Sequence, residues 1–284
     1  MKILFIINPG SGNGELSYPA LIREHFKSAD VDAILYELPK KCSSSQLKSI
    51  IEEAGADRVA AVGGDGTLKL VAECLIGTNI PIAIIPAGSA NGMAKELGIP
   101  VEPEEALDVA YKGNSKKIHA VKVNGELCIH LADIGFNAYI VKRFNALDRR
   151  GMWGYTKAAW SALWNHRKMN VEFVIEGKTI RSEAAMVVIA NATMYGTGLK
   201  INPEGKLDDG LFEIVLVKKY AVMEILKMRF TKMALNPKNI ELFQTTKLNI
   251  RTKHKAHFQV DGEYLGKVNQ VEAEIIPASI SIVL

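Results

Sequence analysis

Three glycine-rich turns, each directly after a short apolar run, limit the fold of this 284-residue chain more than any other feature. The central turn is Gly63-Gly64-Asp65-Gly66-Thr67, and the other two begin at Asn8 and at Pro86. The apolar runs before them are typical of strands covered on both faces of a parallel sheet. Because the carboxyl ends of such strands share one edge of an open sheet, we predict that the three turns converge on one ligand.

The central turn has the composition of a phosphate-binding loop. A helical spacing of apolar residues begins at Leu68, so the turn would aim backbone N–H groups and a helix N-terminus at an anion. Glycine lets a phosphate approach the backbone closely, although glycine alone would fit an ordinary turn equally well. Asp65 would repel a phosphate unless it binds Mg²⁺ or orders the site around it. We therefore interpret this turn as functional.

A change of pattern near residue 116 predicts two domains. Up to residue 115, strands alternate with helices, which predicts a parallel α/β domain with right-handed crossovers. From residue 116 to 284, tight turns such as Asn124-Gly125 separate successive strands, which predicts a mostly antiparallel β-sandwich. Its strands are expected at 117–123, 127–134, 171–175, 181–190, 211–217, 248–250, 256–260 and 271–276.

Three helical insertions are expected in the second domain, at about 139–147, 155–164 and 222–233. The last apolar run, 280–284, either ends the sandwich or returns to the first domain.

Composition and charge narrow the class of protein. Apolar residues make up 48% of the chain and charged residues 23%, as in ordinary globular proteins, and a net charge of +4 is too weak to indicate a nucleic-acid partner. Three widely spaced cysteines favour a reducing compartment without disulfides, and no apolar run approaches the ~20 residues that span a bilayer. We expect a cytoplasmic protein, whose basic clusters are either solvated or attracted to an anionic membrane surface.

Two acidic loops in the second half are candidate functional sites. Asp208-Asp209-Gly210 would suit a hard cation that prefers oxygen ligands, and it would also suit a plain turn. Asp261-Gly262 is a common hairpin signal, and Asp261 is also a candidate base for a hydroxyl nucleophile.

Taken together, these segments resemble the diacylglycerol kinase catalytic domain family, which includes bacterial lipid kinases and sphingosine kinases. The GGDGT motif by itself is shared with NAD kinases and phosphofructokinase-like folds. The whole set of matching segments, in this order along the chain, is more specific. The matching pieces are Asn8-Pro9 with Ser11-Gly12, Gly63 to Leu68, Pro86 to Ser89 with Asn91, Gly135 to Ala138, Asp208 to Gly210 and Asp261 to Glu263.

The resemblance implies an α/β nucleotide-binding domain followed by a β-sandwich, and ATP-dependent, Mg²⁺-dependent phosphorylation of a lipid hydroxyl. It implies that Asp261 is the general base and that Asp65 belongs to the catalytic centre. The implied nucleotide-binding residues are Asn8, Ser11, Gly12, Gly63, Gly64, Gly66, Thr67, Gly88, Ser89, Asn91 and Glu263. The implied metal site is Asp209 with Asp208 and the carbonyls of Lys206 and Leu211, and Asp133 and Asn137 are candidate headgroup contacts.

The sequence departs from the family in three places. Asn13 stands where many members have a basic residue, Lys69 follows the central turn in place of a common asparagine, and Gly92 follows Asn91 where diacylglycerol kinases usually have an aspartate. Lys69 either replaces the missing positive charge or faces solvent. These departures leave the acceptor lipid open.

We expect a lipid kinase that associates peripherally with a membrane and binds no nucleic acid; whether it forms a homodimer stays open. One alternative is a soluble-metabolite kinase resembling NAD kinases. Another is a regulator that binds nucleotide or lipid without turnover.

Overall fold

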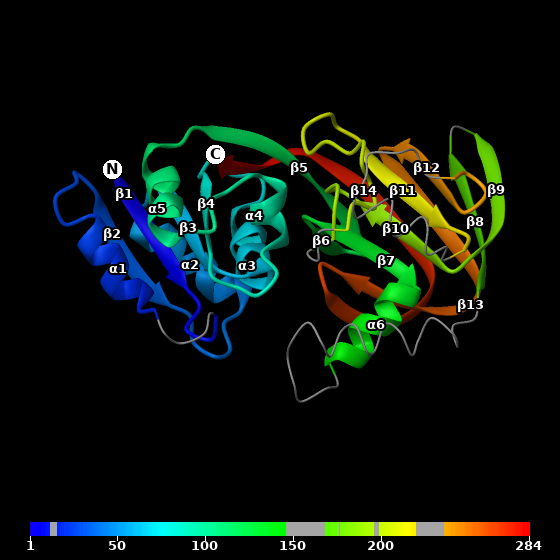
Figure 1. Cartoon of the computed structure of the whole chain (residues 1–284), viewed down its shortest axis with the longest axis horizontal. Helices are drawn as coiled ribbons and strands as arrows, with labels where there is room; N and C mark the ends of the chain where they lie inside the picture. Colours follow the sequence, from blue (N-terminus) through cyan, green and yellow to red (C-terminus); the bar gives the residue numbers. More distant parts are fainter. Residues whose placement is uncertain (12–15, 146–167, 176, 196–198, 220–235) are drawn as a thin grey trace. The chain divides into compact units, whose positions relative to one another are not determined.

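The computed structural model describes residues 1–11, 16–145, 168–175, 177–195, 199–219 and 236–284 of the chain. The chain divides into two compact units, one of residues 1–119 and 277–284 and the other of residues 120–276 (Figure 1). Gly12 and the predicted helices at 155–164 and 222–233 lie outside the described residues.

Unit 1 is built on a parallel sheet. Its strands are β1 (Lys2–Ile7), β2 (Asp32–Glu37), β3 (Arg58–Gly63) and β4 (Ile82–Pro86), in the order β2-β1-β3-β4. All of these pairs are parallel, as the alternation of strands and helices predicts. The end of the last strand, β14 (Glu263–Val283), adds to this sheet beside β4, where Ile282 pairs with Ile82. The final apolar run therefore belongs to unit 1.

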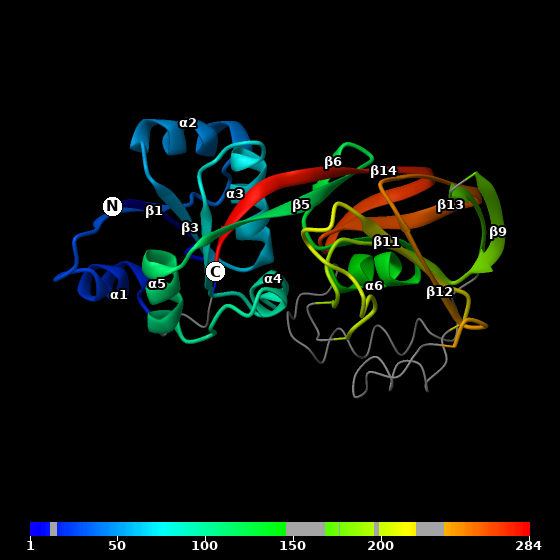
Figure 2. The same cartoon turned by 90° about the horizontal axis from the view of Figure 1, so that it is seen from above.

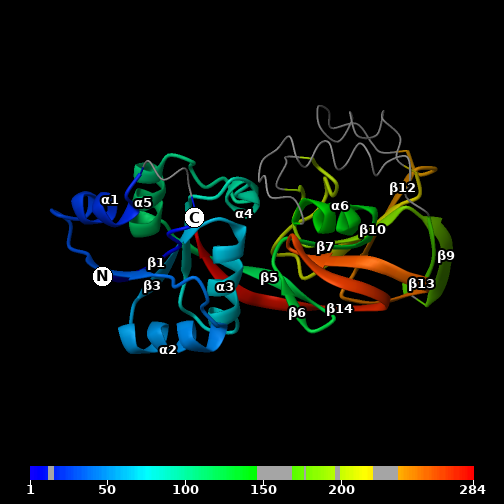
Figure 3. The same cartoon turned by 90° about the horizontal axis from the view of Figure 1, so that it is seen from below.

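Helices cover both faces of this sheet. α2 (Ser44–Ala54) and α3 (Asp65–Leu75) lie on one face, and α1 (Tyr18–His25), α4 (Gly92–Glu96) and α5 (Pro103–Lys112) lie on the other (Figures 2 and 3). This sandwiching leaves β3 and β4 almost fully buried, which is why their sequences are continuous apolar runs.

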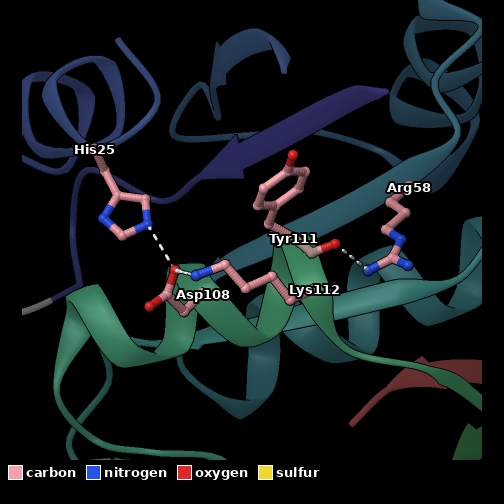
Figure 4. Close-up of polar contacts among 5 residues, drawn as sticks. All are labelled: His25, Arg58, Asp108, Tyr111 and Lys112. Atoms are coloured by element: carbon pink, nitrogen blue, oxygen red, sulfur yellow. Dashed lines mark hydrogen bonds and ion pairs between the residues drawn. The ribbon is translucent and has the colours of Figure 1, made fainter. Parts of the chain in front are cut away.

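Polar contacts fix the ends of individual helices. Ser43 and Gln46 form a reciprocal capping box at the start of α2. At the end of α5, the Arg58 guanidinium donates to the carbonyls of Ala110 and Gly113 at 2.7 and 2.9 Å. It also donates to the Tyr111 carbonyl at 3.2 Å (Figure 4). A cation at a helix C-terminus satisfies carbonyls that lack partners within the helix. Arg58 thereby ties α5 to the start of β3.

Unit 2 is a set of antiparallel strands. The path β12-β11-β10-β7-β13-β14 is joined by the β8-β9 hairpin on β13, and β5 pairs with β6 and β14. The bounds are β5 (Ser115–Val123), β6 (Glu126–Cys128), β7 (Leu131–Gly135), β8 (Met169–Ile175), β9 (Lys178–Ala184), β10 (Met186–Ala190), β11 (Phe212–Val217), β12 (Ile240–Thr245) and β13 (Lys247–Val260). One helix, α6 (Phe136–Asn145), follows β7 directly.

Two hydrophobic clusters use alternate residues of the same strands. Val187 and Ile189 of β10 point into a core shared with β8, β11 and β13, whereas Val188 and Ala190 pack with Phe136 under α6. A strand that is buried on both faces needs apolar residues at every position. This explains the uninterrupted apolar sequence of β10.

Several predicted strands differ from the observed ones. The predicted strand at 181–190 is two strands, because β9 pairs with β8 and β10 pairs with β7 and β11. The predicted strands at 248–250 and 256–260 are one strand, β13, with an irregular register between Arg251 and Ala256. β12 was not predicted. No helix in the described ranges is long and apolar enough to cross a bilayer.

Candidate active site

The three glycine-rich turns of unit 1 meet at the carboxyl ends of β1, β3 and β4. The Asn8 side chain donates from Nδ2 to the Thr67 hydroxyl at 3.1 Å, which joins the first turn to the central one. Gly64 and Gly88 face each other so closely that a Cβ on Gly88 would lie 2.5 Å from the Gly64 Cα. Glycine is required at this contact between the central and third turns. The three turns therefore meet, and the ligand that they would share stays a prediction.

Asp65 connects the central turn to the third turn through its carboxylate. The two oxygens accept hydrogen bonds from the backbone N–H groups of Gly92 and Met93 at 2.9 and 3.1 Å. These are the first N–H groups of α4, which have no partner inside the helix and attract negative charge. Of the two roles considered for Asp65, this geometry supports ordering of the site.

Asn91 and Asn8 shape the two outer turns with their side chains. Asn91 adopts a left-handed backbone conformation with a φ of 49°, and its amide bonds to both the N–H and the carbonyl of Gly88, at 2.9 and 2.7 Å. In the first turn, Asn8 Oδ1 accepts from the Gly10 N–H at 3.0 Å and the Ser11 hydroxyl donates to the Asn8 carbonyl at 2.6 Å. Both asparagines therefore act on the backbone of their own turns, and Ser89 in the third turn is exposed.

The start of α3 remains open to an incoming anion. Its cap is Gly64, which has no side chain to accept from the first N–H groups. The next glycine, Gly66, is exposed, and a Cβ built there would meet no atom within 4 Å. The fold itself therefore does not need a glycine at position 66. Backbone donors at an uncapped helix start, beside a residue without a side chain, are what phosphate binding requires.

Lys69 lies on the second turn of α3 and is only 4% exposed. The alternative in which it faces solvent is therefore wrong. A buried ammonium group in the helix that follows the central turn is compatible with the other alternative, in which Lys69 supplies positive charge.

In unit 2, Asp261 occupies a tight turn between β13 and β14. Asp261 and Gly262 have positive φ values of 49° and 85°, and Val260 pairs with Glu263, which confirms the predicted hairpin. The Asp261 carboxylate accepts from the backbone N–H groups of Ile129, His130 and Leu131 at 3.0, 3.0 and 3.1 Å. It is half-buried and held in one place by a segment some 130 residues away in sequence.

The loop before β11 offers oxygen atoms to a cation. Asp208 and Asp209 are exposed, and Asp209 Oδ1 accepts from the Leu211 N–H at 3.0 Å. Behind the loop, the buried Glu213 carboxylate accepts from Asn202 Nδ2 at 2.6 Å, while Asn202 Oδ1 has no hydrogen-bond partner. Burial raises the pKa of Glu213, and the nearby charge of Asp209 raises it further.

The oxygen atoms of this loop fit a Mg²⁺ ion that keeps most of its water ligands. Over the described residues, no three acidic, histidine or cysteine side chains gather to form a closed metal cage. Asp209 and the carbonyls of Lys206 and Leu211, with water, would make a partly hydrated site of that kind. The surplus of negative charge around Glu213 favours a cation there.

Asp133 and Asn137, the predicted headgroup contacts, lie inside unit 2. Asp133 is fully buried and accepts hydrogen bonds from Asn137 Nδ2 at 2.6 Å, Ala138 N at 2.8 Å, Gln259 Nε2 at 2.5 Å and the Tyr195 hydroxyl at 3.4 Å. Burial raises the pKa of Asp133 to about 6, although these donors oppose the shift. These four donors to the Asp133 carboxylate are all protein groups. A contact of Asp133 with a headgroup stays a prediction.

Comparison with known proteins connects these features to one family. The diacylglycerol kinase catalytic domain model matches residues 2–123, and the YegS C-terminal NAD kinase beta sandwich-like domain model matches residues 131–284. Together the two models account for both units of the chain. The chain belongs to the diacylglycerol kinase catalytic domain family.

Individual relatives align with this chain over nearly its whole length. A diacylglycerol kinase of Mycobacterium tuberculosis is 25% identical over 296 residues, covering 99% of this chain and 94% of that protein. The crystal structure of a diacylglycerol kinase from Bacillus anthracis superimposes with a TM-score of 0.78 at 20% identity, covering 99% of this chain and 96% of the other. An NAD kinase from Archaeoglobus fulgidus in complex with ATP superimposes with a TM-score of 0.55 at 15% identity, covering 100% and 94%. These superpositions show the shared α/β and β-sandwich fold.

Sequence analysis of this kinase-family member missed Gln259, Asn202 and Glu213. Gln259 and Glu213 stand inside strands where neighbouring residues are apolar, which is the one signal that could have marked them as buried polar groups. Their partners lie on other strands or loops, and no local spacing identifies these partners.

Gly66 in the central turn and Gly88 in the third turn should respond differently to an added methyl group. Gly88→Ala should lower the free energy of unfolding by about 1–3 kcal/mol, because its Cβ would overlap the Gly64 backbone. Gly66→Ala should leave stability unchanged or raise it by up to about 1 kcal/mol, because its Cβ meets open space at a helix start. Urea unfolding of both variants measures the difference, and equal losses would contradict the observed contact.

Asp133 should make stability depend on pH. Because its folded pKa is raised to about 6 from an ordinary 3.8, the folded state takes up the proton more readily. This contribution is complete below the ordinary pKa and is lost as pH rises through about 6. Relative to Asp133→Asn, the wild type should gain about 1 kcal/mol of unfolding free energy between about pH 7.5 and pH 5. Urea unfolding across this range tests it; a constant difference between the two proteins would show that Asp133 does not titrate there.

Proposed function

We propose that this protein transfers the γ-phosphoryl group of ATP to the hydroxyl of a lipid, with Mg²⁺. The observation that carries the proposal is the convergence of three turns on the uncapped start of α3, within a chain of the diacylglycerol kinase catalytic domain family. In the transfer, a bond forms between the lipid oxygen and the γ-phosphorus, the bond from that phosphorus to the ADP oxygen breaks, and the hydroxyl proton leaves to a base.

The nucleotide would bind to the three turns of unit 1. Backbone N–H groups at Gly64 to Gly66 and the N-terminal end of the α3 dipole would hold the phosphates, while the Thr67 N–H donates to the Gly64 carbonyl within the turn. Asn8, Ser11, Gly12, Gly88, Ser89, Asn91 and Glu263 would flank the nucleotide, as the family resemblance implies. Asp65 would support nucleotide binding indirectly, because its hydrogen bonds to the α4 N–H groups keep the central and third turns together. The positioned donors, and not a reactive side chain, would stabilise the charge on the phosphoryl group.

Asp261 would act as the general base that accepts the proton of the lipid hydroxyl. Its half-buried carboxylate is held by three backbone N–H groups, so it would meet the acceptor in a fixed position.

Magnesium would have two uses. Mg²⁺ bound with ATP would neutralise phosphate charge during transfer. A second ion would bind Asp209, with Asp208 near by and with the carbonyls of Lys206 and Leu211, and would keep the loop before β11 in place. The buried, unpartnered Asn202 Oδ1 and the Glu213 carboxylate behind this loop support a cation there.

The acceptor would be a lipid alcohol at a membrane surface. Arg251, Lys253, His254 and Lys255 are exposed at the point where the register of β13 with β14 becomes irregular, between Arg251 and Ala256. Each Lys or Arg near an anionic bilayer contributes about 1 kcal/mol to binding. The chain would therefore associate peripherally with the membrane that holds its substrate.

An acceptor panel tests the proposed function. We expect ATP consumption with mixed micelles of diacylglycerol, sphingosine or ceramide, with one lipid clearly preferred, and loss of activity when Mg²⁺ is removed by EDTA. The same lipids in anionic vesicles should bind the protein less tightly as salt rises, because exposed charges are screened. Phosphorylation of NAD and of no lipid would replace the proposal with a soluble-metabolite kinase. Tight ATP binding without any phosphorylated acceptor would indicate a regulator.

The role of Asp261 has its own test. Asp261→Asn should lower kcat by about 100-fold or more while the Kd for ATP stays unchanged, because the variant loses the base and keeps the turns of unit 1. Since Asp261 also holds residues 129–131, melting temperatures and assays well below the melting transition must accompany the kinetics. Turnover equal to that of the wild type would remove Asp261 from the role of base.

A further inference from the structure

One side chain, Gln259, joins the buried Asp133 to the turn that carries Asp261. Its Nε2 donates to Asp133 Oδ2 at 2.5 Å, and its Oε1 accepts from the Gly262 N–H at 2.7 Å. Gln259 is 2% exposed and stands directly opposite Asp133 in the paired strands β13 and β7. A continuous path of two hydrogen bonds therefore runs from the interior of unit 2 to the Asp261–Gly262 turn.

Asp133, at the buried end of this path, determines which end of the Gln259 amide donates and which accepts. An ionised carboxylate only accepts hydrogen bonds, so Gln259 has to present its NH₂ group to Asp133 and keeps its oxygen for Gly262. Asn137 Nδ2 and Ala138 N also donate to Asp133, which reinforces its role as an acceptor. With a pKa of about 6, Asp133 is mostly ionised at neutral pH.

The other end of the path is the turn whose geometry places Asp261. Asp261 and Gly262 both have positive φ, the conformation of a two-residue hairpin turn, which an Asp-Gly pair adopts readily. Three backbone N–H groups hold the Asp261 carboxylate, and the Gly262 N–H is held by Gln259.

We propose that Gln259 is a positioning residue that holds the Asp261–Gly262 turn in place, and that Asp133 sets the direction of its amide. The link itself is a property of unit 2; only its effect on catalysis rests on the proposed function, in which Asp261 is the base. This assignment gives Asp133 a part in the site that does not require contact with substrate.

Reversal of the donor–acceptor direction tests the link. In Asp133→Asn an NH₂ group replaces one carboxylate oxygen, so Gln259 turns its oxygen toward it and its own NH₂ group then faces the Gly262 N–H. In Gln259→Glu, two carboxylates face each other. The double variant Asp133→Asn with Gln259→Glu restores complementarity, because the introduced amide donates to the introduced carboxylate, whose other oxygen accepts from Gly262.

The first measurement is hydrogen exchange of the Gly262 amide followed by NMR. We expect exchange about tenfold faster in each single variant and within about twofold of the wild type in the double variant. Gln259→Met, which keeps the side-chain shape and removes both hydrogen bonds, should also exchange about tenfold faster. It provides the same test if a charged or polar variant fails to fold. Ile250→Val, on the buried face of the same strand, should lower the melting temperature without changing Gly262 exchange.

The second measurement separates positioning from general loss of stability. At a temperature where all variants are folded, the single variants should lower kcat by about 10- to 100-fold with the KM for ATP unchanged, and the double variant should recover most of it. Unchanged Gly262 exchange in the single variants, or a double variant no better than they are, would overturn the link. If wild-type protein phosphorylates no acceptor, the proposed function fails, and the exchange measurements still decide whether Gln259 holds the turn.

Discussion

The Asp65 carboxylate, bound to the first two N–H groups of α4, is the contact on which the arrangement of the unit 1 turns depends. Asp65 stands at the start of one helix and binds the start of another, so its negative charge is favourable at both positive helix ends. The contact keeps the third turn against the central one, where Gly64 and Gly88 touch without side chains. Because the Asp65 carboxylate binds α4, no side chain caps the start of α3, where the Thr67 and Leu68 N–H groups donate to the Gly64 carbonyl.

Unit 2 uses the same kind of contact three times. The carboxylates of Asp261, Asp133 and Glu213 each accept from donors on a separate loop, strand or helix. Burial of a carboxylate costs free energy unless such donors replace water, and the raised pKa values of Asp133 and Glu213 show that part of this cost remains. A substitution at any of these acids therefore changes stability as well as the site, which is why each needs a control variant that changes stability alone.

Sequence-based prediction succeeded where the signal lies in neighbouring residues. The turn at Asn124-Gly125 is a two-residue hairpin with positive φ at both residues. It failed where pairing decides the outcome: Ala185 separates β9 from β10, although the apolar pattern runs through it, since the two strands have different partners. Lys69, a lysine that sequence alone could equally place in solvent, is buried in the fold, where other elements of unit 1 pack against α3.

The sequence by itself determined the parallel sheet, the three glycine-rich turns at the ends of its strands and the antiparallel second half, because periodicity and glycine conformations are properties of adjacent residues. Only the tertiary structure decided which N–H groups each acid binds. Asp261 meets Ile129 to Leu131 and Gln259 meets Asp133 across more than 120 residues of chain. Such pairs form because a buried donor and a buried acceptor must satisfy each other once the strands are packed. The spacing of residues within either partner segment does not predict which donor will meet which acceptor.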